Sequence, residues 1–108
     1  MTSDQQKHDV FQAIADPTRR SILRLLAGND MSIKAIKDFF PLSRTAVNKH
    51  LHILVNAEVI RSKKVGRETK YQLTPAPLAE LRQWLVFFDG YWNDNLANLR
   101  KVVESGHE

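Results

Sequence analysis

The chain has 108 residues, enough for one domain, and this length excludes a two-domain cofactor enzyme. Apolar residues make up 43% of it and charged residues 26%, so we expect a folded globular core rather than disorder. It contains no cysteine, which excludes disulfides, thiolate metal ligands and thiol nucleophiles, and its formal net charge is +4.

The first predicted helix covers about residues 4–15. Ser3 and Gln6 have the spacing of a capping box, in which two side chains satisfy free backbone N–H groups at a helix start. The apolar residues that follow have helical spacing and would face one side.

A second helix is predicted to start at Asp16 and Pro17. An acidic N-cap followed by proline at the first helical position is a typical start, because proline lacks only an N–H that has no partner there. The helix is expected to reach Ala27 and to end at Gly28 and Asn29, two residues that tolerate positive φ.

A helix-turn-helix unit is predicted over about residues 32–56. Ser32 would cap a short helix that ends at Phe40, and after a turn of three residues Ser43 would cap a longer helix to about Asn56. Two helices joined by so short a turn form the unit whose second helix enters the major groove of DNA.

Over about residues 59–73 the apolar period changes from 3.6 to 2, which predicts a β-hairpin with Gly66 and Arg67 at its turn. This two-stranded ribbon carries several basic residues. Because an isolated hairpin is marginally stable in water, it must pack on the helices.

The last predicted helix covers about residues 77–104, and it is apolar over more than half of its circumference. A chain of this size can bury only one face of such a helix. The remaining apolar face implies a partner chain, so we expect a homodimer. The expected dimer-interface residues are Phe11, Leu81, Leu85, Phe88, Trp92, Leu96 and Leu99.

Together these elements predict a mostly α-helical chain with a small β-hairpin, organised as one winged helix-turn-helix domain with a long C-terminal dimerisation helix. At this level the sequence resembles a known family. The stretches FQAIADPTRRSILRLLA and SRTAVNKHLHILVNAEVIRSKKVGRETKYQL are similar to the ArsR/SmtB family of bacterial winged-helix repressors, over about residues 11–73. The resemblance implies a dimer built on the terminal helix and control of neighbouring genes.

Metal sensing does not follow from the resemblance. Sensors of this family carry either a Cys-rich motif on the helix before the turn or Asp/His pairs on the terminal helix. Where the Cys-rich motif would lie, this chain has the sequence MSIKAIKDFF, which contains no cysteine. Its terminal helix offers Asp89, Asp94 and Glu104 but no histidine before His107. We therefore expect no metal site and no cofactor; a site shared by His8 and His107 across a dimer is the remote alternative.

The expected partner is double-stranded DNA. Residues 43–73 carry a net charge of +5, whereas the chain from Thr74 onward carries −2, and a local basic patch is typical of a polyanion binder. Arginine or lysine can recognise guanine, asparagine can pair with adenine, and a threonine methyl can meet a thymine methyl. The expected DNA-binding residues are Ser43, Arg44, Thr45, Asn48, Lys49, His52, Lys63, Lys64, Arg67 and Lys70.

Several residues keep two interpretations at this point. Trp84, Phe87 and Tyr91 extend the apolar surface of the last helix, which is either a dimer interface or the wall of an effector pocket. Arg19 and Arg20 either pair within the fold or contact phosphate. His50 is expected to face the core or to bond to a helix cap, and the basic ribbon could instead serve only to prevent edge aggregation.

The sequence thus predicts a homodimeric, sequence-specific DNA-binding regulator, most simply a repressor on a pseudo-palindromic operator. The alternatives are a metal- or small-molecule-responsive derepressor with an unknown effector, and a winged helix that binds only protein. An enzyme is disfavoured because no phosphate loop or catalytic set is present. The polar start MTSDQQKHDV and the lack of a long apolar run indicate a cytoplasmic protein without a membrane partner.

Overall fold

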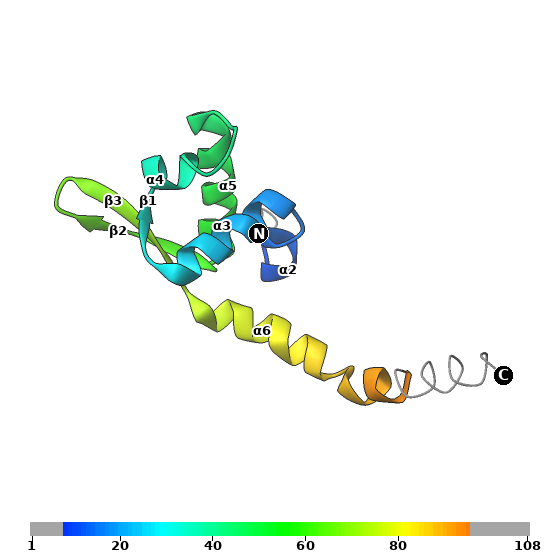
Figure 1. The fold of residues 1–108 in the computed structure, drawn as a ribbon. Coiled ribbons are helices and arrows are strands. Elements are labelled where there is room, and N and C mark those ends of the chain that lie inside the picture. The colour runs from blue at the N-terminus through cyan, green and yellow to red at the C-terminus, as the bar shows by residue number, and fades with distance from the viewer. Residues whose placement is uncertain (1–7, 96–108) are drawn as a thin grey trace, which may run out of the picture.

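The computed structural model describes residues 8–95, in which a helical body carries a small antiparallel sheet on one side and a helix that leaves the body on the other (Figure 1). The elements in chain order are α2 (Val10–Ala13), α3 (Pro17–Gly28), β1 (Met31–Ser32), α4 (Ile33–Lys37), α5 (Arg44–Asn56), β2 (Ile60–Val65), β3 (Glu68–Leu73) and α6 (Pro75–Val86). This order confirms the predicted winged helix-turn-helix fold.

One hydrophobic core holds these elements together. Its fully buried members come mainly from α3, α5 and the start of β2, for example Ile22, Leu51 and Ile60. Burying one such side chain contributes roughly 1.5–3 kcal/mol to folding. Among the described residues no polar or charged side chain is buried, so the polar groups that could serve a function lie at the surface.

The helix α2 begins later than the sequence suggested. Asp9 is its N-cap, and Asp9 and Gln12 form a capping box in which each side chain accepts a hydrogen bond from the other's backbone N–H. Because Asp9 has an extended backbone, the prediction of an unbroken helix through this position is wrong. The proposed capping residues Ser3 and Gln6 lie outside the described residues.

The helix α3 begins as predicted and ends differently. The Asp16 carboxylate accepts a hydrogen bond from the backbone N–H of Arg19 at 3.0 Å, and Pro17 occupies the first turn. At the other end Asn29 is extended, with φ of −172°, so the expected positive-φ ending is wrong. A positive φ would turn the chain back at the helix end, whereas here the extended Asn29 leads directly into β1.

The helix-turn-helix unit has the two serine caps expected from the sequence. The Ser32 hydroxyl accepts a hydrogen bond from the Ala35 N–H, and the Ser43 hydroxyl accepts one from the Ala46 N–H. α4 is shorter than predicted: it ends at Lys37, and Phe40 N–H bonds to the Lys37 carbonyl three residues back, which tightens the chain into the turn.

The sheet has three strands in the order β1-β3-β2, all antiparallel, so the expectation of a two-stranded ribbon is wrong. β1 has only two residues, Met31 and Ser32, and pairs with Tyr71 and Lys70 of β3. A strand this short has no periodic signal in the sequence. The hairpin of β2 and β3, the wing, turns at Gly66, whose φ of 65° suits the first position of a two-residue loop.

The last helix is interrupted. α6 ends at Val86, residues 87–88 form a turn, and helical structure resumes over residues 89–95, so the predicted unbroken helix is wrong within the described part. Phe88 N–H bonds to the Leu85 carbonyl at 3.0 Å, a spacing of three rather than four residues. Aromatic and β-branched residues, which favour helix weakly, crowd this position. Leu96, Leu99 and the rest of the predicted helix lie outside the described residues.

Figure 1 shows α6 leaving the body as an arm that points away from the wing. α2 is the element of the helical body that packs against it. No helix within residues 8–95 is both long enough and apolar enough to cross a membrane.

Candidate nucleic-acid interface

The outer face of α5 carries the side chains predicted to read DNA. Val47, Leu51 and Leu54 anchor the helix in the core, and the opposite face is exposed. The exposed residues on it are Arg44, Thr45, Asn48, Lys49 and His52. Four of these line a shallow hollow of about 450 Å³ together with Ile53. The exposure predicted for all five residues is therefore confirmed.

Ser43 has a structural task as the N-cap of α5. It is exposed, and its hydroxyl accepts the hydrogen bond from Ala46 N–H at 3.1 Å. The cap fixes where the helix begins and therefore sets which residues occupy its first exposed turn. A direct contact of Ser43 with DNA stays a prediction.

The wing distributes its basic residues over both faces. Lys63 pairs directly with Lys70 across the two strands, and Lys64 pairs with Thr69, so Lys64 points to the opposite face. Lys63, Lys64 and Arg67 at the turn are exposed, whereas Lys70 is half-buried. Like charges directly opposite each other destabilise a ribbon, so this arrangement favours an anion next to the pair.

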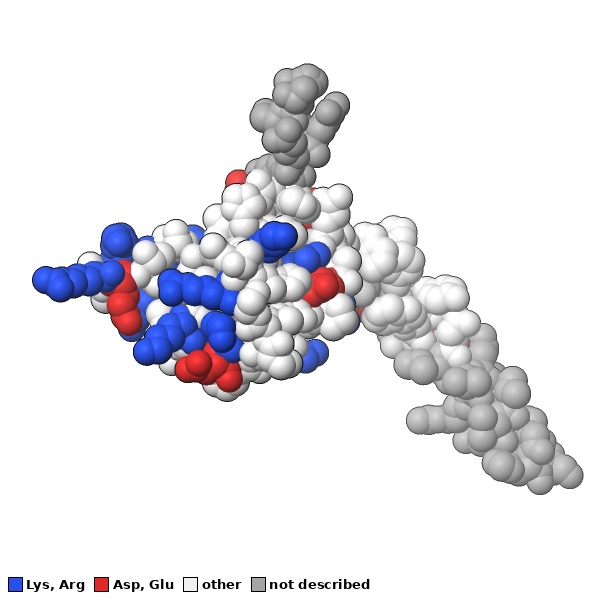
Figure 2. All heavy atoms as spheres, turned by 90° about the horizontal axis from the view of Figure 1, so that it is seen from above, with Lys and Arg blue, Asp and Glu red and all other residues white. Residues whose placement is uncertain are grey.

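Lysine and arginine gather on the wing and the adjoining surface of the body, whereas the described part of the α6 arm is mainly uncharged (Figure 2). A few acidic side chains interrupt the basic surface in this view. The sequence places Glu68 in β3, diagonal to Lys63 on the same face of the wing. Residues 43–73 carry a net charge of +5 in the sequence. In the structure these residues form α5 and the wing, which are separated from the largely uncharged described part of the arm (Figure 2).

A hydrogen-bonded chain of three side chains at the base of the wing was not predicted. Arg61 of β2 donates from Nε to Gln72 Oε1 of β3 at 2.7 Å, and Gln72 Nε2 donates to Asp30 Oδ2 at 3.3 Å. Arg61 is one of the basic residues of the predicted hairpin, but no sequence pattern indicates that Gln72 and Asp30 are its neighbours. Only the strand register and the position of Asp30 just before β1 bring them together.

Arg19 and Arg20 bond within the fold, to backbone carbonyls rather than to acidic side chains. Arg19 donates from Nε to the Ala13 carbonyl at 2.8 Å and from Nη2 to the Gln12 carbonyl at 3.1 Å. Arg20 donates from Nη1 to the Ile14 carbonyl at 2.7 Å. These carbonyls lie at the end of α2, where backbone carbonyls run out of helical partners; only that of Gln12 also accepts a backbone hydrogen bond, from the Ala15 N–H at 3.2 Å. Both arginines therefore stabilise the corner between α2 and α3.

His50 joins the recognition helix to this corner. Its Nδ1 lies 3.4 Å from Arg19 Nη1 and 3.9 Å from Asp16 Oδ2, so the half-buried ring lies beside the α3 cap but beyond hydrogen-bond distance of the Asp16 carboxylate. Partial burial acts to raise the pKa of Asp16, but the Arg19 backbone N–H and the nearby His50 and Arg19 charges outweigh it and hold this pKa below its usual range.

The exposed side of α6 is aromatic. Trp84, Phe87, Tyr91 and Trp92 are exposed, and Phe87 is the most exposed at 81%. Ring contacts run along this surface from Phe11 to Trp84 at 5.7 Å and from Trp84 to Phe88 at 5.1 Å. The hollow of about 330 Å³ among Trp84, Phe88, Tyr91 and Trp92 is shallow and lies entirely on this arm.

The seven expected interface residues do not share one environment. Leu85 and Trp92 are exposed, and Phe88 is half-buried among neighbouring rings. Phe11 and Leu81 pack partly against the core of their own chain and have less surface to offer. Leu96 and Leu99 lie outside the described part of the chain.

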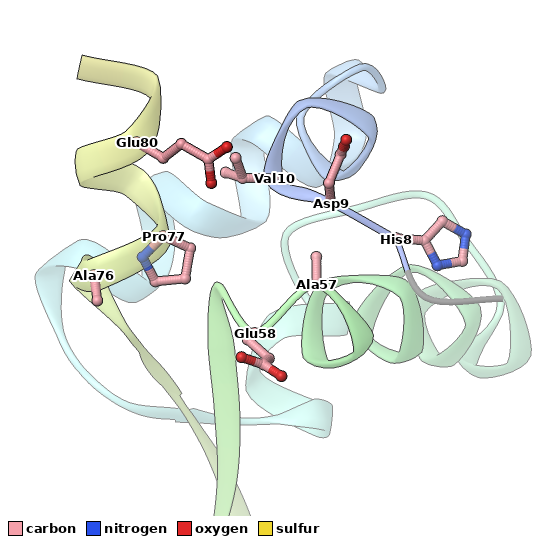
Figure 3. Close-up of a pocket in the computed structure, with 8 residues that line it drawn as sticks. All are labelled: His8, Asp9, Val10, Ala57, Glu58, Ala76, Pro77 and Glu80. Carbon is pink, nitrogen blue, oxygen red and sulfur yellow. The ribbon is translucent and has the colours of Figure 1, made fainter. Parts of the chain in front are cut away.

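A hollow on another side of the body is lined by acidic residues, in contrast to the basic wing. It measures about 570 Å³ and lies between α2, the end of α5 and the start of α6, with Asp9, Glu58 and Glu80 among its lining residues (Figure 3). Asp9 already caps α2, and the His8 ring bonds to Asn56 at 3.1 Å. Carboxylates repel phosphate, so this hollow is no part of a DNA interface. Within residues 8–95 no three His, Cys, Asp or Glu side chains come together as metal ligands do.

Comparison with known proteins agrees with this architecture. Residues 14–63 match the model of a helix-turn-helix domain family. The transcriptional repressor SdpR of Bacillus subtilis is 41% identical over 81 residues, which cover 75% of this chain and 90% of that protein. The HTH-type transcriptional regulator Rv2034 of Mycobacterium tuberculosis is 32% identical over 97% of this chain and 95% of its own length.

The fold has a close match among solved structures. The crystal structure of a possible transcriptional regulator for arsenical resistance is 35% identical, covers 87% of this chain and 95% of its own, and superposes with a TM-score of 0.69. The match therefore extends over nearly all of that protein.

Proposed function

Because this chain belongs to the ArsR family of winged-helix transcriptional regulators, which bind DNA and are not enzymes, we propose that it is a homodimeric repressor of a pseudo-palindromic operator. One observation carries the proposal: the exposed basic and polar surface of α5 and the wing lies at the other end of the molecule from the aromatic α6 surface. Each surface fits a different partner.

The first partner is the DNA duplex. The five exposed side chains of α5 supply donors, acceptors and a methyl group for base edges in the major groove. Lys63, Lys64 and Arg67 of the wing supply positive charge for phosphates or for the adjacent minor groove. Base contacts then set the sequence preference, and wing contacts set the affinity.

The second partner is another copy of this chain. Exposed tryptophan, tyrosine and phenylalanine on α6 and the helical segment that follows it form an apolar surface of the kind that proteins bury in interfaces. Packing the two arms together would place two α5 helices on one side of the dimer. Their half-sites should then lie one DNA turn apart, about 34–36 Å.

Repression follows from occupancy, because a dimer bound over promoter DNA blocks transcription. The similar B. subtilis protein is named a transcriptional repressor, which supports repression rather than activation.

A salt titration tests the DNA-binding part of the proposal. Affinity for an operator duplex, measured by band shift from 50 to 200 mM salt, should fall steeply, because about 6–10 phosphates are neutralised per dimer. An affinity that does not change with salt, or no shift at all at low salt, would contradict it.

A further inference from the structure

The side-chain arrangement at the base of the wing fixes the orientation of one arginine. Arg61 donates from Nε to Gln72 Oε1 at 2.7 Å, and Gln72 Nε2 lies 3.3 Å from Asp30 Oδ2. An ionised carboxylate only accepts hydrogen bonds, so Asp30 requires the NH₂ end of the Gln72 amide to face it. The amide oxygen then has to face Arg61, and the chain of bonds has one direction.

This orientation matters because it uses only one of the five N–H groups of the guanidinium. The four N–H groups on the two Nη atoms form the fork that binds phosphate oxygens in pairs. Arg61 is exposed, whereas Gln72 and Asp30 are half-buried. The two partners therefore hold the base of the side chain and leave its fork at the surface.

Arg61 also shares a face of the wing with the lysine pair. Residues two apart on a strand point to the same side, so Arg61 and Lys63 of β2 lie beside Gln72 and Lys70 of β3. Ile60, on the alternate side, is buried in the core, so the face that carries Arg61 is the outer one. Arg61 at the base of the wing is therefore followed, one step nearer the tip, by Lys63 and Lys70 side by side.

We propose that Arg61 is a phosphate-contacting residue of the DNA interface, and that Gln72 and Asp30 are its positioning residues. Lys63 and Lys70 extend the same row, so the outer face of the wing follows the DNA backbone. The proposal rests on DNA binding by the winged helix but not on dimerisation or on any operator sequence. Phosphate contacts are independent of sequence, so an arbitrary duplex is a sufficient probe.

The first test compares two arginines. A fluorescent 30-base-pair duplex of random sequence is titrated with the full-length protein by anisotropy at several salt concentrations. Arg61→Ala should weaken binding about tenfold at low salt and reduce the slope of log affinity against log salt by about 0.9 for each protomer bound, the value for one lost phosphate contact. Arg24→Ala removes the same charge from the exposed side of α3 and should change affinity less than about twofold.

The second test is a double-mutant cycle that separates positioning from charge. Gln72→Ala should weaken binding about threefold in the wild type and have no effect in the Arg61→Ala background, because its action passes through Arg61. Arg61→Lys keeps the charge but has no Nε to bond to Gln72, so it should bind with intermediate affinity and be insensitive to Gln72→Ala. Circular dichroism and the Tm of each variant report whether it is folded.

Two results would overturn the proposal. One is an Arg61→Ala salt slope equal to that of the Arg24→Ala control. The other is an equal effect of Gln72→Ala with and without Arg61. If the wild-type protein itself does not bind the duplex, DNA binding fails rather than this assignment, so the two failures are distinguishable.

Discussion

The α5–wing surface and the α6 surface are both exposed, but their chemistry is opposite. The first has basic and polar side chains projected from elements that are anchored in the core. The second has aromatic side chains on an arm with no fully buried residue in its described part; only Leu78 and Leu81 near its start pack partly against the core. A charged surface is stable in water and needs no cover, whereas an aromatic surface of this kind is costly to leave in water. The two ends of the molecule therefore call for different partners.

The corner between α2 and α3 connects the elements that carry the two surfaces. Phe11 of α2 contacts Trp84 of α6, and Arg19 of α3 bonds both to the end of α2 and to His50 of α5. A short path of packed rings and hydrogen bonds thus runs from the arm to the recognition helix. Substitutions at either surface or at this corner can test whether the two surfaces are as independent as their chemistry suggests.

The largest expected effect is on the aromatic arm. Trp92→Glu places a charge on the exposed α6 surface and should convert a dimer into monomers, as measured by sedimentation equilibrium. Operator affinity should then fall by about 100-fold, because the second half-site no longer adds avidity. Gln83→Glu, which adds the same charge at an exposed polar position of α6, is the control. A dimer that persists in Trp92→Glu would leave the aromatic surface without its proposed partner.

The next effect lies on the recognition helix. Asn48→Ala should cost about 2 kcal/mol of binding to the preferred operator, roughly 30-fold in affinity, with little change for random duplexes. The measurement is the ratio of the two affinities by band shift. Asn29→Ala, an exposed asparagine at the end of α3, should keep the wild-type ratio. An unchanged ratio in Asn48→Ala would remove Asn48 from base recognition.

A moderate effect is expected at the corner between the two surfaces. Asp16→Ala removes the N-cap of α3 and should lower the free energy of unfolding by about 1 kcal/mol, measured by urea denaturation at pH 7. Asp16→Asn retains a good cap and isolates the contribution of the charge.

The pH dependence of that charge has a defined sign. The pKa of Asp16 is lowered in the folded protein, so its ionised form stabilises the fold above the unfolded value of about 3.9. This contribution is lost as the pH falls through the lower, folded pKa. The stability difference between wild type and Asp16→Asn should therefore shrink below about pH 4, and a difference that grows there would contradict the assignment.

The smallest effect is expected from a single wing lysine. Lys64→Ala should weaken binding to all duplexes by a similar severalfold factor and reduce the salt slope by about 1 for each protomer bound. Band shifts on operator and random DNA provide both numbers. A loss confined to the operator would mean that Lys64 reads bases, and the division between base-reading helix and phosphate-binding wing would be wrong.

The sequence predicted those features that local patterns encode. Asp16, Ser32 and Ser43 are helix caps as expected, since cap residues bond only three positions along the chain. The exposed face of α5 and the hairpin turn at Gly66 also follow from short-range spacing. The order of the predicted elements then indicated the winged helix-turn-helix arrangement, with which the family resemblance agreed.

The features that sequence reasoning missed depend on distant residues. β1 exists because Met31 and Ser32 meet β3 some forty positions later, and two residues show no period of their own. Gln72 and Asp30 are likewise 42 positions apart, so neither marks Arg61 in the sequence. The interruption of α6 at residues 87–88 is hidden by an apolar spacing that continues through it. In each case the local structure is determined by contacts between residues that are distant in the sequence or by packing, and not by local propensity.

Selection of bound sequences from a random duplex pool tests the central claim most directly, because it reports base recognition and dimerisation together. A dimer should enrich an inverted repeat whose half-sites are centred about one helical turn, roughly 10 base pairs, apart. Enrichment of a single unpaired half-site, or no enrichment over the starting pool, would contradict a dimer that places two recognition helices in successive major grooves.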